Sequence, residues 1–251
     1  MSAGTKVGSM SPLTLQVAYE ALGRDQLPFP FVSDDVDYDS HGAYVDARRV
    51  VVEQVINGDF DHLDDWGETL FWADLRIEML CVGYRAATTE PESIIRVHAT
   101  RRGDNGYVAI QRPRRDSTPS QIDVFKVDAI ELASGVVSHL PPTPAGTLGS
   151  VDLTATSHTT VYDDGAATLD PAVWSLSGTI QVLPFSGLNW AFDPRARRIR
   201  FKDHTSGRYR YDQHYGQTTA IPATAADLTT EINRDIAALV KKIREATGQT
   251  R

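Results

Sequence analysis

The chain contains one cysteine, Cys81, among its 251 residues. A single cysteine cannot form an intramolecular disulfide, so the fold must be stable without that kind of cross-link. Cys81 lies in the apolar stretch LRIEMLCVGYR, which favours a small buried hydrophobe over a reactive thiol. This sparing use of cysteine is typical of proteins from a reducing compartment.

Long apolar runs are also missing. No stretch approaches the roughly 20 apolar residues that a membrane-spanning helix needs. The first residues, MSAGTKVGSM, lack the apolar core of a signal peptide. We therefore expect a soluble, cytoplasmic protein with no membrane insertion. Because residues 1–11 are small and polar, we expect them to be disordered.

An excess of positive charge is lacking too, since 25 basic residues face 33 acidic ones and the net charge is -8. General phosphate-binding surfaces are usually basic, so this balance argues against one without excluding a local basic patch. The sequence also lacks the G-x-S-x-G, H-E-x-x-H, P-loop and G-x-G-x-x-G motifs, each of which marks a particular chemistry. We expect no enzyme: no catalytic residues, no cofactor and no metal.

The first half of the chain changes from helical to strand-like patterns. Leu13, Leu15 and Val17 alternate with more polar neighbours, which predicts a short strand near the start. Apolar spacing then predicts helices over 43–57 and 62–72. Period-two alternation predicts the following strands, and a helix with capping-box spacing closes this half. The predicted strands are 75–84, 94–100, 107–112 and 122–127, and the helix is 128–140.

The second half repeats this order. Strands are predicted at 178–185, 198–212 (two strands around a turn) and 218–221, followed by a long helix over 222–246. Thr224 and Asp227 have capping-box spacing at the start of that helix. A hairpin, a strand and a capped helix thus occur twice. We infer a single domain, 12–251, built from two pseudo-repeats at about 12–142 and 143–251; residues 143–176 show little pattern and read mostly as loop.

The stretch DHTSGRYRYD, residues 203–212, allows three interpretations. As a hairpin, its alternation places the tyrosines on one face and solvated arginines on the other. As part of a nucleic-acid surface, it would act with the basic stretches 112–115 and 195–200. As a metal site, it would use His204 and His214 as cross-strand neighbours, although no third ligand is evident. The hairpin interpretation explains the pattern without a ligand.

Four segments together resemble the EspG family of ESX (type VII) secretion-associated proteins of actinobacteria. They occur in the family's order and span most of the chain. The D-x-x-S/D-G-R-Y turn and the P-A-x-x-x-x-L opening of the last helix are their most characteristic parts. The segments are LTLQVAYEALGRDQLPFPF, WGETLFWADLRIEMLCVGYR, IDVFKVDAIELASGVVSHLPP and DHTSGRYRYD with TTAIPATAADLTTEINRDIAALV.

The resemblance implies an α+β fold with a central antiparallel β-sheet flanked by two helical bundles in a quasi-twofold arrangement. It also implies a cytoplasmic chaperone that binds the helical tip of a PPE protein in a PE–PPE heterodimer and keeps this client soluble for export. The alternative from another functional class is a nucleic-acid-binding protein that uses the basic hairpins. The oligomeric state stays open between a monomer and a weak dimer.

The resemblance also indicates where a client would bind. In the family, the sheet face, the loop after the second strand and the C-terminal bundle form the client site, and here that loop is 85–93, RAATTEPES. Its short and charged side chains suit rim contacts that select a partner. Trp190 is a secondary candidate, because it can be either a binding anchor or a core residue. The expected partner-binding residues are Arg85, Thr88, Thr89, Glu90, Glu92, Thr179, Gln181, Leu183 and Trp190.

Overall fold

The computed structural model describes residues 4–33, 38–84, 91–112, 120–152, 174–187, 191–214 and 217–246. Within these ranges, ten strands form one sheet in the order β1-β5-β4-β3-β2-β7-β8-β9-β10-β6. Every neighbouring pair is antiparallel. The strands are β1 Thr5–Met10, β2 Leu75–Tyr84, β3 Pro91–Arg102, β4 Asn105–Arg112, β5 Gln121–Asp128, β6 Val151–Asp152, β7 Trp174–Pro184, β8 Ile199–His204, β9 Gly207–His214 and β10 Gln217–Pro222.

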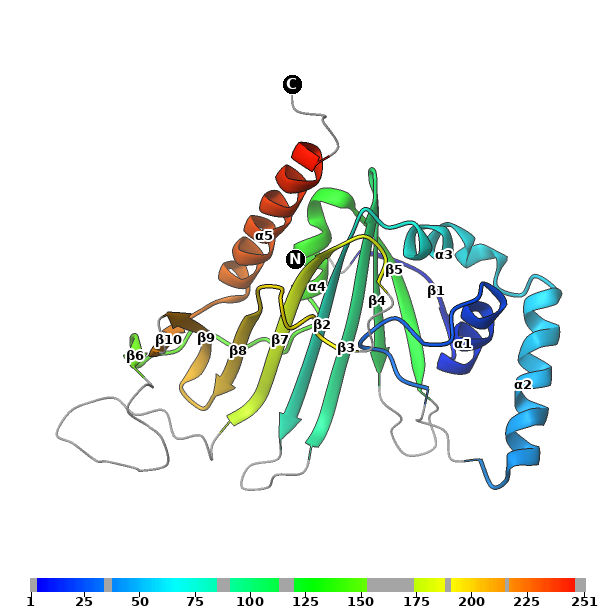
Figure 1. Cartoon of the computed structure of the whole chain (residues 1–251). Helices are drawn as coiled ribbons and strands as arrows, with labels where there is room; N and C mark the ends of the chain where they lie inside the picture. The colour runs from blue at the N-terminus through cyan, green and yellow to red at the C-terminus, as the bar shows by residue number, and fades with distance from the viewer. Residues whose placement is uncertain are drawn as a thin grey trace.

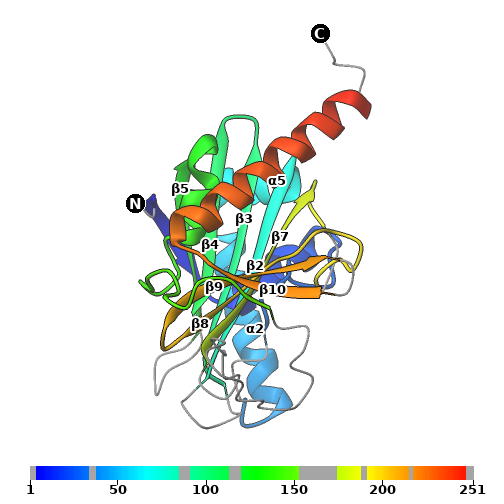
Figure 2. The same cartoon turned by 90° about the vertical axis from the view of Figure 1, so that its left-hand side faces the viewer.

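The helices gather in two places. The first three lie together at the β1–β5 end of the sheet. α4 lies behind the sheet against β3, β4 and β5, and α5 runs beside it along β7 and β8 (Figures 1 and 2). This arrangement confirms the predicted α+β class with a central antiparallel sheet. The helices are α1 Pro12–Ala21, α2 His41–Ile56, α3 Asp64–Phe71, α4 Leu132–Val137 and α5 Ala225–Ala246, with short 3-10 turns η1 Asp61–Leu63 and η2 Ala129–Glu131.

Each face of the sheet has its own apolar core. On one face, alternate residues of the central strand β2, such as Ile77 and Met79, pack with Leu132 of α4 and Ile232 of α5. On the other face, residues of β4 and β5 pack under α1 and α3, with Trp66 near the centre of that cluster. The period-two alternation of β2 is what allows one strand to serve two differently covered faces.

Two expectations for the N-terminus are wrong. Residues 5–10 are not disordered, because they form β1 and pair with the edge strand β5. Residues 12–21 form helix α1 rather than a strand. The Ser11 hydroxyl accepts a hydrogen bond from the Thr14 amide at 3.0 Å, and Pro12 occupies the first helical turn. A capping serine followed by proline starts a helix, and these local signals outweigh three alternating apolar residues.

The two halves of the sheet share one topology. β2 and β7 form the central pair; β2–β5 are followed by α4, and β7–β10 are followed by α5. This common order agrees with the sequence pattern. The quasi-twofold duplication, and the division of one domain into repeats at 12–142 and 143–251, stay predictions.

The stretch 203–212 forms the β8–β9 hairpin, as expected, but its arginines are not a solvated face. Arg208 is fully buried and paired with Asp203 across the hairpin. The two histidines are not cross-strand neighbours, since His204 pairs with Gly207 and His214 with Gln217. Within the described ranges, no cluster of three or more histidine, cysteine, aspartate or glutamate side chains has metal-site geometry, and none of the helices is long and apolar enough to cross a membrane.

Candidate partner-binding face

The central strands carry two rows of half-buried side chains on the sheet face opposite α4. Residues paired across neighbouring strands share a face, so the register assigns the rows directly. The first row crosses five strands from β3 to β9, and the second lies one step nearer the β2–β3 connection. We call these residues the open face: Arg96, Leu80, Thr179, Arg200 and Tyr211 in the first row, and Ile94, Val82, Ser177 and Lys202 in the second.

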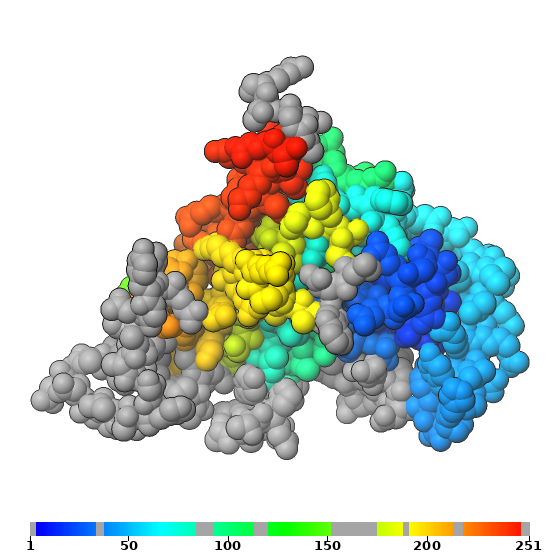
Figure 3. Space-filling model, in the orientation of Figure 1, coloured from blue at the N-terminus to red at the C-terminus, as the bar shows by residue number. Residues whose placement is uncertain are grey.

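The middle of the open face is apolar. Leu80 and Val82 point to it from β2, and Ile94 is the cross-strand partner of Val82 on β3. All three are half-buried. In Figure 3 the cyan-green atoms of β2 and β3 lie at the surface, below the yellow atoms of the segment that follows β7. A half-buried apolar strip on a sheet face suits a protein partner with an apolar surface of its own.

Basic residues border this strip. Arg200 and Lys202 of β8 lie on one side of it, and Arg96 of β3 lies on the other. The Lys202 ammonium lies 5.6 Å from the centre of the Tyr211 ring, which is within cation–π range. Partial burial lowers the pKa of Lys202 and raises the pKa of Tyr211. Arg96, Arg200 and Lys202 thus form a basic margin on both sides of the apolar strip.

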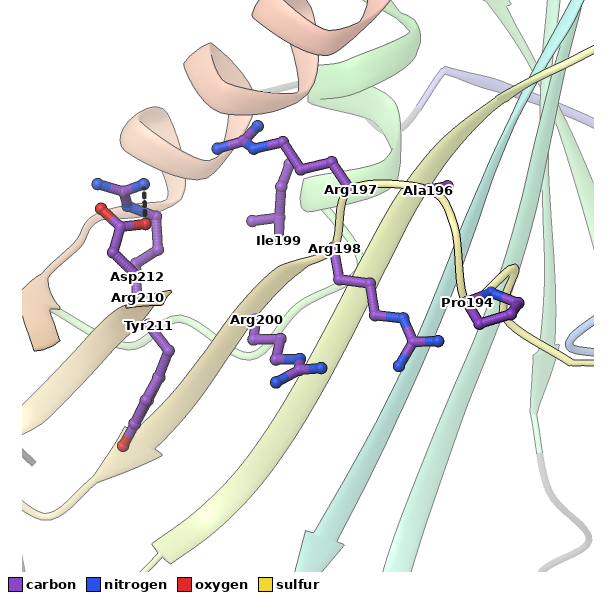
Figure 4. Close-up of a pocket in the computed structure, with 9 residues that line it drawn as sticks. All are labelled: Pro194, Ala196, Arg197, Arg198, Ile199, Arg200, Arg210, Tyr211 and Asp212. Carbon is purple, nitrogen blue, oxygen red and sulfur yellow. Dashed lines mark hydrogen bonds and ion pairs between the residues drawn. The ribbon is translucent and has the colours of Figure 1, made fainter. Parts of the chain in front are cut away.

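A pocket of about 400 Å³ continues this margin between the segment 194–198 and the strands β8 and β9 (Figure 4). Arg198 and Arg200 extend over the sheet, whereas Arg197 extends toward α5. Arg197 pairs with Glu231 and Asp235 of α5, each at 2.6 Å. Burial raises the pKa of Glu231, but its hydrogen bond to Arg197 and the nearby guanidinium charges outweigh that effect and lower it. These ion pairs hold segment 194–198 against α5.

The other end of the same sheet face, around Arg76, His98 and Gln181, is covered. Polar side chains of the sheet hold irregular segments at 28–32, 184–187 and 191–196 through hydrogen bonds to backbone atoms. Arg76 donates to the carbonyls of Pro184 and Phe185, and His98 Nδ1 lies 2.6 Å from the Phe29 carbonyl oxygen. Burial lowers the pKa of His98 to about 4, so this ring is neutral at pH 7.

Gln181 makes the corresponding contacts to the second segment. Its Oε1 accepts from the Asp193 amide at 2.8 Å, and its Nε2 donates to the Asp193 carbonyl at 2.7 Å. Gln181 is 0% exposed and Leu183 is 3% exposed. In this structure Gln181 lies beneath the covering segment and Leu183 is buried, so neither side chain is part of the accessible surface.

The remaining expected site residues divide into two groups. Thr179 is half-buried in the first row of the open face, where it pairs with Leu80 and Arg200. Glu92 is in β3, beside the β2–β3 connection. Arg85, Thr88, Thr89, Glu90 and Trp190 lie outside the described residues.

Sequence reasoning did not identify Leu80, Val82 and Ile94 as site residues. The sequence nevertheless contains a pattern that points to them. Leu80 and Val82 alternate with the core residues Met79 and Cys81, so the strand is apolar on both faces. A strand of this kind requires a cover on each side, and among the described residues helices cover β2 only on the side of α4 and α5.

The family model described as the EspG family matches residues 11–179. The chain belongs to the EspG family. The match leaves out β1 and covers α1 to α4, β2 to β5 and the first part of β7, up to Thr179. It therefore includes the centre of the open face.

A solved structure similar to this EspG-family chain is the Mycobacterium tuberculosis type VII secretion system chaperone EspG5 in complex with a PE25–PPE41 dimer. The identity is 13% and the TM-score is 0.47, over 89% of this chain and 93% of that one. No curated protein matches.

Proposed function

We propose that this EspG-family chain is a cytoplasmic, cofactor-free chaperone of type VII secretion and not an enzyme. Its client is the helical tip of a PPE protein in a PE–PPE heterodimer, which it keeps soluble for export. Family membership supports the chaperone class. The observation that carries the client site is the open face, where Leu80, Val82 and Ile94 form an apolar centre with a basic margin.

This arrangement suits the physical problem that an apolar helical tip poses. Exposed apolar patches promote aggregation, and a chaperone must cover such a patch without enclosing the whole client. Protein interfaces combine a desolvated apolar core with a polar rim that selects the partner. On the open face Val82 lies in the core, and Arg200 and Lys202 supply the rim.

The position of the open face also agrees with the loop expected to contact the client. Val82 and Ile94 form a cross-strand pair near the end of the β2–β3 ladder, which continues only to Tyr84 and Pro91. The β2–β3 connection, which holds most of the expected loop 85–93, therefore begins and ends at the border of the open face. A client seated on Val82 would lie within reach of this loop, which fits a rim that selects partners.

The nucleic-acid alternative loses support from the same contacts. It required accessible bases and aromatics on one surface, but Arg208 is buried and paired with Asp203. Arg197 and Arg210 are paired with acids as well. The basic surface that remains is a margin rather than a continuous groove.

Binding of a PE–PPE heterodimer tests the proposal. The protein is co-expressed with a tagged pair, beginning with any pair encoded beside its gene, and affinity is measured by calorimetry. Val82→Glu and Thr179→Arg each place a charge on the open face, and we expect each to weaken binding by about tenfold or more. Ile130→Ser is the matched control, because Ile130 is 87% exposed on η2.

Thermal unfolding of each variant verifies that the fold is intact. Wild-type affinity of both folded open-face variants would show that the client binds elsewhere. Failure of every PE–PPE pair tested to bind the wild-type protein would reject the proposed client class.

A further inference from the structure

A second apolar surface lies among the N-terminal helices, at the end of the sheet away from β8–β10 (Figure 1). α1 and α3 form its walls, and the C-terminal end of α2 closes one side. The cavity between them has a volume of about 570 Å³. We call it the helical groove; its apolar lining includes Leu15, Leu22, Val55, Phe60, Phe71 and Trp72.

Large apolar side chains remain exposed at the helical groove. Leu22 at the end of α1 is 62% exposed, and Trp72 at the end of α3 is 69% exposed. Beneath them, Trp66 and Leu70 are buried and fix the floor. An exposed tryptophan and leucine above a packed aromatic floor resemble the anchors of a protein interface more than a core that is already complete.

The rim of the helical groove is acidic. Asp61, Asp64 and Glu68 line it, and Asp65 adjoins them on α3. Glu68 pairs with Arg102, whereas Asp61 and Asp64 form no ion pair with any residue in the part of the chain that the structure describes. Arg24, the one basic residue in the lining, stacks over the Phe71 ring with 5.5 Å to its centre. The charge that would complement this rim is positive.

We propose that the helical groove is a docking site for an amphipathic helix of another protein, with an apolar face flanked by lysine or arginine. Two helices at the sides of an apolar groove are the usual receptor for a third helix, which inserts side chains at i, i+3, i+4 and i+7. The acidic rim selects basic flanks and disfavours acidic helices. This partner is distinct from the PE–PPE client.

The separation of the two surfaces supports two partners. The helical groove is made of α1, α2, η1 and α3, whereas the open face is made of β2, β3, β7, β8 and β9. They share no residue. A chaperone with the open face occupied would therefore still present the helical groove, which would let a second protein recognise the loaded complex.

The test uses the full chain and a fluorescent synthetic helix of about 18 residues, with leucines at i, i+3, i+4 and i+7 and lysines beside them. Fluorescence anisotropy measures its binding. A peptide of the same composition with scrambled leucines controls for attraction by the net charge of -8. A third peptide carries glutamates in place of the lysines.

We expect the amphipathic basic helix to bind, and both control peptides to bind at least about tenfold more weakly. Leu22→Ser with Trp72→Ala should weaken binding by a similar factor. Asp61→Asn with Asp64→Asn should weaken it at low salt and leave less salt dependence. Ile130→Ser, which removes an even more exposed apolar side chain elsewhere, should bind like the wild type.

Three results would overturn the proposal. The first is equal binding of the ordered and scrambled basic peptides. The second is self-association in analytical ultracentrifugation that the Leu22→Ser, Trp72→Ala variant abolishes, because the occupant would then be a second copy of this chain. The third is loss of PE–PPE binding in that folded variant, which would make the groove part of the client site. PE–PPE binding that survives in this variant separates the two proposals.

Discussion

Arg208 and Asp203 form a bidentate ion pair across the β8–β9 hairpin. Nε donates to Oδ1 at 2.6 Å and Nη2 donates to Oδ2 at 2.8 Å. The pair is buried, and each member has a further partner: Arg208 also donates to the Pro141 carbonyl, and the Thr143 hydroxyl donates to Asp203. The pair thus joins the hairpin to the segment after α4.

Removing one partner of this pair should destabilise the protein strongly. Asp203→Asn leaves a buried guanidinium without its counter-charge, and we expect the free energy of unfolding to fall by about 3–5 kcal/mol. Urea unfolding measures the change. The double variant Asp203→Leu, Arg208→Met removes both charges and should lose less than Asp203→Asn alone; a larger loss would contradict this account.

The packing of α5 makes a graded prediction. Ile232 is 0% exposed within the main core, whereas Ile236, one turn further on, only packs against its edge. Ile232→Ala should cost about 2–5 kcal/mol of unfolding free energy, and Ile236→Ala should cost clearly less. If urea unfolding shows that the two variants lose the same free energy of unfolding, the two side chains lie in equivalent environments and the prediction is wrong.

The capping box of α5 should contribute measurably. Thr224 Oγ1 accepts from the Asp227 amide at 3.1 Å, and Asp227 Oδ2 accepts from the Thr224 amide at 2.7 Å. Thr224→Ala should lower the free energy of unfolding by about 0.5–2 kcal/mol. Thr230→Ala is the matched control, since Thr230 is exposed in the same helix and bonds only to the Ala226 carbonyl. A control as destabilised as the cap variant would reject the capping role.

Local sequence signals predicted most of the fold. Strong alternation identified β2, and reciprocal capping residues identified the start of α5, because both signals depend on neighbours in sequence. The start of the chain was predicted poorly for the same reason. Thr5–Met10 forms a strand only because the edge of β5 is available to pair with it, and no local pattern reveals that edge.

The candidate site was harder to predict than the fold. Thr179 lies on the open face, but Gln181, two residues along the same face, is covered by Asp193 and Ala196. Alternation assigns a residue to a face and does not say which part of that face an irregular segment will cover. The segment's position depends on contacts between residues far apart in sequence, such as the ring contact of Phe29 with Phe192.

His98 should make stability depend on pH. Its pKa is about 4 in the folded protein because of burial, against about 6.5 when unfolded. The unfolded state therefore binds more protons between these values, so this contribution to stability is fully present above pH 6.5 and is lost as the pH falls toward 4, by an amount on the order of 3 kcal/mol.

His98→Gln keeps a donor for the Phe29 carbonyl without titrating, and its urea-unfolding free energy should fall less between pH 7 and pH 4.5. His62→Gln, at an exposed position, should retain the wild-type pH dependence. If the His98 variant loses as much stability on acidification as the wild type, the buried ring is not the group that senses pH.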